Sequence, residues 1–89
     1  MEILYTKRFQ KHYKKNDVYI QSQAKRTIEL FRRNPLDLIL RNHPLTGDYL
    51  GYRSIDVTGD FRIIFAELSD GRYELVELVD IGTHSQLYG

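Results

Sequence analysis

The sequence predicts a single α+β domain over residues 1–89, in which a helical hairpin packs on one face of a small, mainly antiparallel sheet. Two observations predict this class. Apolar residues recur at helical spacing in the first third of the chain. From residue 52 onward the spacing becomes two, and glycine-containing turns separate short apolar segments. The expected order of elements is therefore β-α-α-β-β-β.

The first third of the chain contains one strand and two helices. Residues 2–5 are expected to form an edge strand. Thr6 is a suitable N-cap for a helix over residues 7–16, which contain no helix breaker. Asp17 is a suitable N-cap for a second helix, which Pro35 limits at its other end. One apolar stripe runs along this second helix: Ile20, Ala24, Ile28 and Phe31.

The remainder of the chain is expected to form a meander of three strands joined by tight turns: 52–58, 61–68 and 73–81. Before the meander, residues 36–41 are expected to contain a turn of helix and residues 43–47 an ordered loop. After Gly82 we expect a loop that carries His84 and is held to the core by residues 87–88.

The composition excludes several classes of protein. The absence of cysteine excludes disulfides and thiolate metal ligands. No segment approaches the ~20 apolar residues of a membrane span, and no signal-peptide pattern opens the chain. The histidines at 43 and 84 lack the closely spaced partners of a zinc site, and the isolated turn glycines do not form a phosphate loop. We therefore expect a cytoplasmic protein without a metal or cofactor and without a membrane partner.

The net charge of +1 conceals an uneven distribution. Residues 1–34 contain nine Lys/Arg and three acids, whereas residues 35–89 contain four Arg and nine acids. A basic half of this kind is typical of a surface that faces a polyanion. The alternative is that the lysines form the solvated faces of the two helices, and charge alone does not separate these interpretations.

Polar side chains that could carry chemistry occur near the ends of predicted strands: His43, Asp56, Asp60, Arg62, His84 and Tyr88. In a meander such positions can converge. Two histidines and a carboxylate supply what RNA cleavage needs. One group takes the proton of a ribose 2′-OH, which attacks the adjacent phosphorus, and another protonates the departing 5′-oxygen. An arginine could stabilise charge on the phosphoryl oxygens.

Each of these residues also has a purely structural interpretation. A histidine before proline, such as His43, is typical of a hydrogen-bonded loop. Asp56 could face solvent, Asp60 could serve only as a turn residue, and Arg62 could pair with Glu77 across the strands. The residue types alone do not separate a nuclease from a binding module.

Four blocks of the chain resemble, in order and spacing, the YafQ-like branch of the RelE/ParE toxins: His43-Pro44-Leu45-Thr46-Gly47, Leu50-Gly51-Tyr52-Arg53, Asp60-Phe61-Arg62-Ile63-Ile64-Phe65, and Gly82-Thr83-His84 through Leu87-Tyr88-Gly89. The resemblance covers the whole chain. Toxins of this group are bacterial mRNA interferases that cut messenger RNA in the ribosomal A site. The resemblance therefore implies the ribosome and mRNA as partners, a DinJ/RelB-like antitoxin encoded beside the toxin, and promoter DNA bound through that antitoxin.

The resemblance also implies roles for individual residues. His43 and His84 become acid–base groups, and Asp60 becomes a catalytic or orienting carboxylate. Arg62 would steady the phosphate, and Tyr88 would help to position the substrate. At position 56 the family has a further histidine, and an aspartate there could accept a proton or orient His84 but is a poor general acid at neutral pH. The surface expected to meet ribosomal RNA comprises Lys7, Lys11, Lys14, Lys15, Lys25 and Arg32.

Two other functions stay open at this point. A ParE-like toxin would inhibit a topoisomerase without cutting RNA, although binding alone does not require paired histidines. A degenerate toxin would retain only antitoxin or promoter binding, and Asp56 is the one residue that favours it. The same basic surface could also dock an acidic antitoxin segment that folds on binding.

Overall fold

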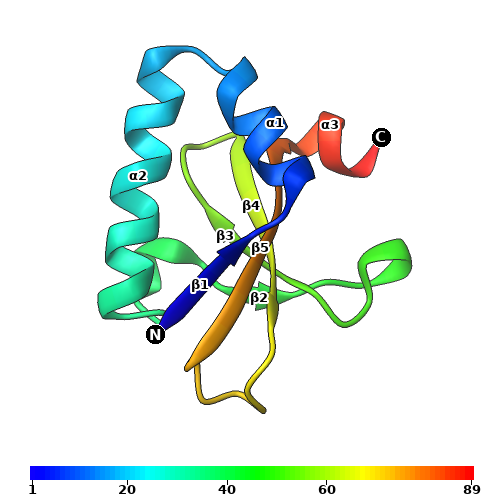
Figure 1. Cartoon of the computed structure of the whole chain (residues 1–89). Coiled ribbons are helices and arrows are strands. Elements are labelled where there is room, and N and C mark those ends of the chain that lie inside the picture. Colours follow the sequence, from blue (N-terminus) through cyan, green and yellow to red (C-terminus); the bar gives the residue numbers. More distant parts are fainter.

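The computed structural model describes residues 1–89 and confirms the α+β class. Its helices pack on a mixed five-stranded sheet of order β1-β5-β4-β3-β2 (Figure 1). The strands are β1 (Glu2–Tyr5), β2 (His43–Pro44), β3 (Arg53–Asp56), β4 (Phe61–Glu67) and β5 (Leu75–Thr83). The helices are α1 (Lys7–Lys15), α2 (Val18–Arg33) and α3 (His84–Tyr88), with 3₁₀ turns η1 (Leu38–Leu40) and η2 (Gly47–Tyr49). β1 runs parallel to β5, and the other neighbouring strands are antiparallel.

The two long helices begin at the predicted N-cap residues. The Thr6 hydroxyl accepts a hydrogen bond from the Phe9 N–H at 3.0 Å, and the Asp17 carboxylate accepts one from the Ile20 N–H at 2.9 Å. These side chains satisfy backbone donors that have no partner within the helix. None of the helices combines the length and the apolar character needed to cross a bilayer.

Both long helices bury their apolar faces against one face of the sheet. Phe9 of α1 and Ala24 and Phe31 of α2 belong to the buried core. The Phe31 ring meets Phe65 of β4 edge-on, with 4.9 Å between the ring centroids. Because burying a phenylalanine side chain contributes about 1.5–3 kcal/mol, this contact fixes the helical hairpin firmly to the sheet.

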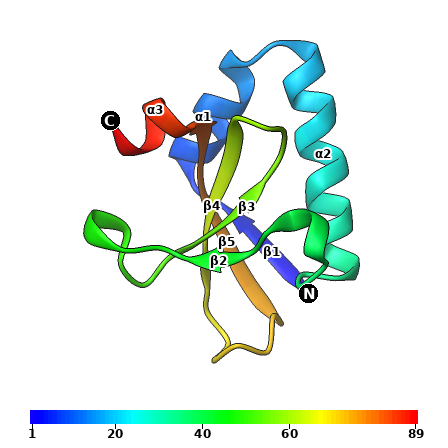
Figure 2. The same ribbon diagram turned by 180° about the vertical axis from the view of Figure 1, so that it is seen from behind.

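The side chains of β3 and β4 alternate between the two faces of the sheet, and polar residues lie on the face that the helices do not cover. Ile55 and Ile63 are fully buried in the core beneath the helices. Since successive side chains of a strand point to opposite faces, the intervening Ser54, Asp56 and Arg62 point away from the helices. Figure 2 views the molecule from this side, with β2 in front of the central strands.

The prediction of a loop after Gly82 is wrong, because β5 continues to Thr83 and the last residues form helix α3. Thr83 and Gln86 form a capping box. The Thr83 hydroxyl accepts from the Gln86 N–H at 3.1 Å, and the Gln86 side-chain oxygen accepts from the Thr83 N–H at 2.8 Å. This local pair starts a helix directly after the strand. Leu87 is buried, as expected, and holds α3 to the sheet.

Gly82 lies in close contact with α3, because this helix folds back onto its own strand. A Cβ atom on Gly82 would lie 3.0 Å from the side-chain oxygen of Gln86 and 3.4 Å from a methyl group of Leu87. The close approach of helix and strand sets the position from which His84 projects.

Other element ends differ from the predicted ones by a few residues. β5 begins at Leu75, two residues later than expected, because Asp70, Gly71 and Tyr73 have left-handed backbone conformations that keep the chain in the turn. Residues 43–47 do not form a loop throughout, since His43 and Pro44 pair with β3 as the short strand β2. The expected helical turn within residues 36–41 is confirmed as η1.

A glutamate closes the turn between β4 and β5. Glu67 accepts hydrogen bonds from the N–H and hydroxyl of Ser69 and from the N–H of Tyr73. Burial of the carboxyl acts to raise its pKa, but these hydrogen bonds outweigh that effect and hold the pKa of Glu67 below its usual value of 4.5. Because the folded-state pKa is lowered, the stabilisation is present above the unfolded pKa and is lost as pH falls through the folded value.

Glu67→Gln is therefore expected to lower the free energy of unfolding by about 1 kcal/mol at pH 7, a modest value because solvent screens this half-buried carboxyl. The deficit should shrink as pH falls below 4.5 and the wild-type carboxyl gains its proton. Urea unfolding at several pH values measures it. Glu74→Gln removes an exposed carboxylate from the same turn and should have little effect. A deficit that did not change with pH would mean that the charge of Glu67 is not the cause.

Candidate active site

A pocket of about 350 Å³ brings together residues from four separate segments. His43 and Ser54 come from β2 and β3, Arg62 comes from β4, and His84 and Tyr88 come from α3. Its remaining lining residues are Arg41, Leu45, Thr46 and Asp56. The pocket therefore contains five of the six residues singled out at strand ends in the sequence.

His43 is held in one tautomer. Its Nδ1 atom lies 2.7 Å from the carbonyl oxygen of Arg41, on an exposed part of the pocket. A carbonyl oxygen can only accept, so Nδ1 must carry a proton. In neutral His43 the Nε2 atom then has a free lone pair, which is the arrangement that a general base requires.

His84 lines the same pocket from α3, next to aromatic residues. Its ring centroid is 4.8 Å from that of Tyr88, one turn further along α3. Tyr88 in turn meets Tyr49 of η2 edge-on at 5.7 Å. The His84 side chain is exposed and makes no hydrogen bond within the protein, so both ring nitrogens are free for a substrate.

Asp56 forms ion pairs with two arginines at the centre of the pocket. Its carboxylate lies 3.0 Å from Nε of Arg62 and 3.5 Å from Nε of Arg41. Asp56 and Arg62 are both mostly buried, whereas Arg41 is exposed. The register of the β3–β4 hairpin places Asp56 directly opposite Arg62. The alternative pairing of Arg62 with Glu77 is wrong, because Glu77 lies opposite Ala66, further along β4.

Asp60 and the basic helical residues do not line this pocket. Asp60 is exposed in the turn between β3 and β4, where its N–H faces the Thr58 hydroxyl at 3.4 Å. The predicted RNA-facing residues are all exposed on the helical hairpin: Lys7, Lys11, Lys14, Lys15, Lys25 and Arg32. They belong to the helices, whereas the pocket opens on the other face of the sheet.

Sequence reasoning missed the neighbouring Tyr49 and four residues that line the pocket: Arg41, Leu45, Thr46 and Ser54. Arg41 follows η1 in a segment without a periodic pattern, and nothing in the sequence links it to Asp56. Tyr49 packs against the Tyr88 ring. In the sequence it is marked only as an aromatic residue that lies between two glycines. Ser54 could have been identified, because it shares the polar face of β3 with Asp56.

Ser54 is fully buried, and its hydroxyl is the one buried side-chain polar atom without a hydrogen-bond partner. Ser54→Ala is therefore expected to leave the free energy of unfolding unchanged or to raise it by up to about 1 kcal/mol. The matched control is Ser69→Ala. Ser69 is also buried, but its hydroxyl donates to Glu67 and accepts two backbone N–H bonds, so about 1–3 kcal/mol should be lost. Urea unfolding measures both, and a loss at Ser54 similar to that at Ser69 would contradict the prediction.

A histidine–carboxylate pair outside the pocket joins α1 to β5. Nδ1 of His12 on α1 lies 2.6 Å from the carboxylate of Asp80, which is almost fully buried in β5. Asp80 also accepts the N–H of Ile81 at 2.8 Å. This pair ties α1 to β5 only a few residues before α3 begins, so it helps to define where His84 lies.

Comparisons with known proteins agree on one family. The family model described as the bacterial toxin of the type II toxin–antitoxin system, YafQ, matches residues 1–89. The mRNA interferase toxin YafQ of Escherichia coli strain K12 is 36% identical over 55 residues, a segment that covers 62% of this chain and 55% of that toxin. The chain thus matches only about half the length of this relative.

Solved structures match over the whole chain. The crystal structure of YafQ from E. coli strain BL21(DE3) has a TM-score of 0.78 at 26% identity and covers 99% of this chain and 98% of that one. A crystal structure of the E. coli DinJ–YafQ complex has a TM-score of 0.76 at 26% identity, with the same shares covered. The chain therefore belongs to the YafQ family of toxins from type II toxin–antitoxin systems.

Proposed function

We propose that this protein is a ribosome-dependent endoribonuclease that cleaves messenger RNA and is neutralised by a cognate antitoxin. The observation that carries the proposal is the meeting of His43 and His84 in one pocket with Arg41 and Arg62. Two titratable groups beside two cations suit a reaction in which protons move and a phosphate gains charge. The similarity to the E. coli mRNA interferase toxin YafQ supports the same activity.

In the proposed mechanism His43 is the general base. Its Nε2 lone pair, free because Nδ1 donates to the Arg41 carbonyl, takes the proton of the ribose 2′-OH. The 2′-oxygen attacks the adjacent phosphorus, and the bond from phosphorus to the 5′-oxygen breaks. Protonated His84, which lines the same pocket, gives a proton to that leaving oxygen. The products are a 2′,3′-cyclic phosphate and a 5′-hydroxyl end, and each proton is accounted for.

The other pocket residues hold the substrate in this mechanism. The arginines meet the negative charge that develops on the phosphoryl oxygens. Tyr88 lines the pocket and is 37% exposed, so its ring is proposed to stack on a base, and stacking of this kind contributes about 1–3 kcal/mol per base. Asp56 is a positioning residue here, because its carboxylate is already committed to both guanidinium groups. Asp60 stays a prediction without a contact in the pocket.

The basic helical surface is the proposed contact for ribosomal RNA, with salt-sensitive binding as its signature. Its residues are Lys7, Lys11, Lys14, Lys15, Lys25 and Arg32. The proposed protein partner is an antitoxin of the DinJ/RelB type, supported by the similarity to YafQ in its complex with DinJ. Promoter DNA would be bound through that antitoxin, and such a toxin would act in the cytoplasm.

The test is cleavage of a defined mRNA by the purified protein with and without ribosomes, with the cut sites mapped by primer extension. Cuts inside the ribosomal A site that require ribosomes are the expected result. Growth arrest with intact mRNA and DNA damage would instead indicate a topoisomerase inhibitor. Failure of the protein both to cut and to arrest growth would indicate a toxin that retains only antitoxin or promoter binding.

A further inference from the structure

We propose that Arg41 is a phosphate-binding residue of this pocket and that it presents the more available of the two guanidinium groups. This inference rests on the proposed action on RNA, but it concerns binding and can be tested without cleavage. It follows from counting which nitrogen atoms of each arginine already have partners.

Arg62 has little capacity left for a ligand. A guanidinium group has five N–H donors, one on Nε and two on each terminal nitrogen. Nε of Arg62 is 3.0 Å from Asp56, and Nη1 donates to the carbonyl of Gly59 at 3.1 Å, with the carbonyls of Thr58 and Phe61 at 3.4 Å. Only Nη2 is open. Arg62 therefore links Asp56 to the turn that joins β3 to β4 and offers a phosphate only the two N–H donors of Nη2.

Arg41, in contrast, has most of its guanidinium donors free. The single polar contact of its side chain is Nε to Asp56 at 3.5 Å, and that side chain is 76% exposed. Both terminal nitrogens are therefore free to form the two parallel hydrogen bonds with which arginine binds a phosphate. The Arg41 end of this ion pair is exposed and the 3.5 Å contact is long, so the guanidinium group can turn to share a ligand without leaving Asp56 unpaired, because Arg62 also pairs with it.

The backbone of Arg41 joins this donor group to the acid–base site. Arg41 lies in the left-handed conformation (φ 51°, ψ 44°) at the end of η1, where glycine or asparagine would be less strained. Its carbonyl oxygen binds Nδ1 of His43 at 2.7 Å. One residue thus fixes the tautomer of the proposed base and presents a guanidinium group beside it, which suits a phosphate next to the reacting ribose.

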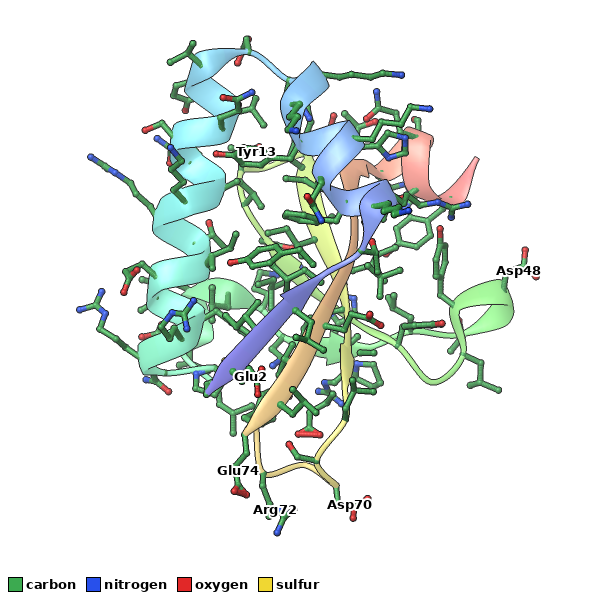
Figure 3. All side chains as sticks on the ribbon, in the orientation of Figure 1. Glu2, Tyr13, Asp48, Asp70, Arg72 and Glu74 are labelled. Carbon is green, nitrogen blue, oxygen red and sulfur yellow. The ribbon has the colours of Figure 1, made fainter.

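Arg72 provides a matched control. It is also exposed (68%), and its Nε also pairs with a carboxylate, that of Glu74 at 3.2 Å, in addition to donating to the Ser69 carbonyl at 3.0 Å. Figure 3 shows Arg72 and Glu74 at the tip of the β4–β5 turn, away from the loop that carries Asp48. Arg41→Gln and Arg72→Gln therefore remove the same charge from the same kind of environment, and only the first changes the pocket.

The experiment measures binding of a fluorescein-labelled 2′-O-methyl RNA oligonucleotide, which lacks the attacking hydroxyl, by fluorescence anisotropy over a range of salt concentrations. Arg41→Gln is expected to weaken binding about tenfold and to reduce the slope of log K against log salt by about 0.7. Arg41→Lys should keep the slope but recover only part of the affinity, because lysine lacks the planar fork. Arg72→Gln should bind as the wild type does.

Unchanged affinity and slope in Arg41→Gln would overturn the inference, as would an equal loss in Arg72→Gln or no binding by the wild type at low salt. Weaker binding by Arg41→Gln, combined with a wild type that cuts no RNA on ribosomes, would refute the proposed nuclease and leave Arg41 as an RNA-phosphate contact. The two proposals therefore fail separately.

Discussion

Replacing His84 with alanine is expected to lower ribosome-dependent cleavage of mRNA by about 10²–10⁴-fold, the usual contribution of a general acid. His84 is exposed and its ring makes no hydrogen bond within the protein, so the free energy of unfolding should not change. Ser85→Ala is the matched control, since Ser85 is the next residue of α3, is also exposed and does not line the pocket. Single-turnover cleavage and urea unfolding measure the two quantities.

The pH dependence separates the two histidines. A general base must be deprotonated, so the rate rises with pH through its pKa, whereas a general acid must be protonated, so the rate falls as pH rises past its pKa. His84→Ala should therefore remove the fall at high pH, and His43→Ala should remove the rise at low pH. Equal cleavage by wild type and His84→Ala would exclude His84 from the reaction. If His84→Ala removed the rise at low pH and His43→Ala removed the fall at high pH, the proposed roles of the two histidines would be reversed.

The fold was predictable from the sequence wherever local rules decide it. The caps at Thr6 and Asp17 and the stripe that ends in Phe31 determine both long helices, because helix ends and amphipathic faces depend on residues a few positions apart. The capping box of α3 is equally local and could have been read as a helix start. It was missed because five residues after a strand are typical of a loop.

The candidate site was predictable only where one hairpin determines it. Gly59 lies midway between Asp56 and Arg62, so the turn itself predicts that these two residues face each other across the hairpin. The place of Arg41 in the pocket depends instead on the pairing of β2 with β3, in which His43 lies opposite Ser54. A 3₁₀ turn joins these two strands, and no periodicity in the sequence reveals it. Long-range pairing of this kind is a property of the assembled sheet, and single-sequence reasoning does not reach it.

Asp56→Asn is expected to separate a positioning role from an acid–base role, and its effect should appear in kcat. The substitution keeps the shape of the side chain but removes the charge that aligns Arg41 and Arg62. Loss of a negative charge a few ångströms from the phosphate favours binding by about 1 kcal/mol in water. Loss of alignment acts in the opposite direction, and mainly in the transition state, where the arginines must meet developing charge.

These two effects predict a distinctive result for Asp56→Asn. KM should stay level or fall, kcat should fall about tenfold, and both limbs of the pH–rate profile should remain. The free energy of unfolding should fall by about 1–3 kcal/mol, because Arg62 is only 20% exposed and loses a charged partner. Steady-state kinetics over a range of pH, with urea unfolding alongside, measures all four quantities.

If Asp56 were instead the general base, the same substitution would lower kcat by about 10²–10⁴-fold and would remove the rising limb of the pH–rate profile. The geometry argues against that outcome. Each carboxylate oxygen of Asp56 already pairs with a guanidinium group, whereas Nε2 of His43 has a free lone pair at the same pocket. An aspartate at this position therefore suits an enzyme in which one histidine takes a proton from the 2′-OH, the other gives its own proton to the leaving oxygen, and the carboxylate holds the two arginines in place.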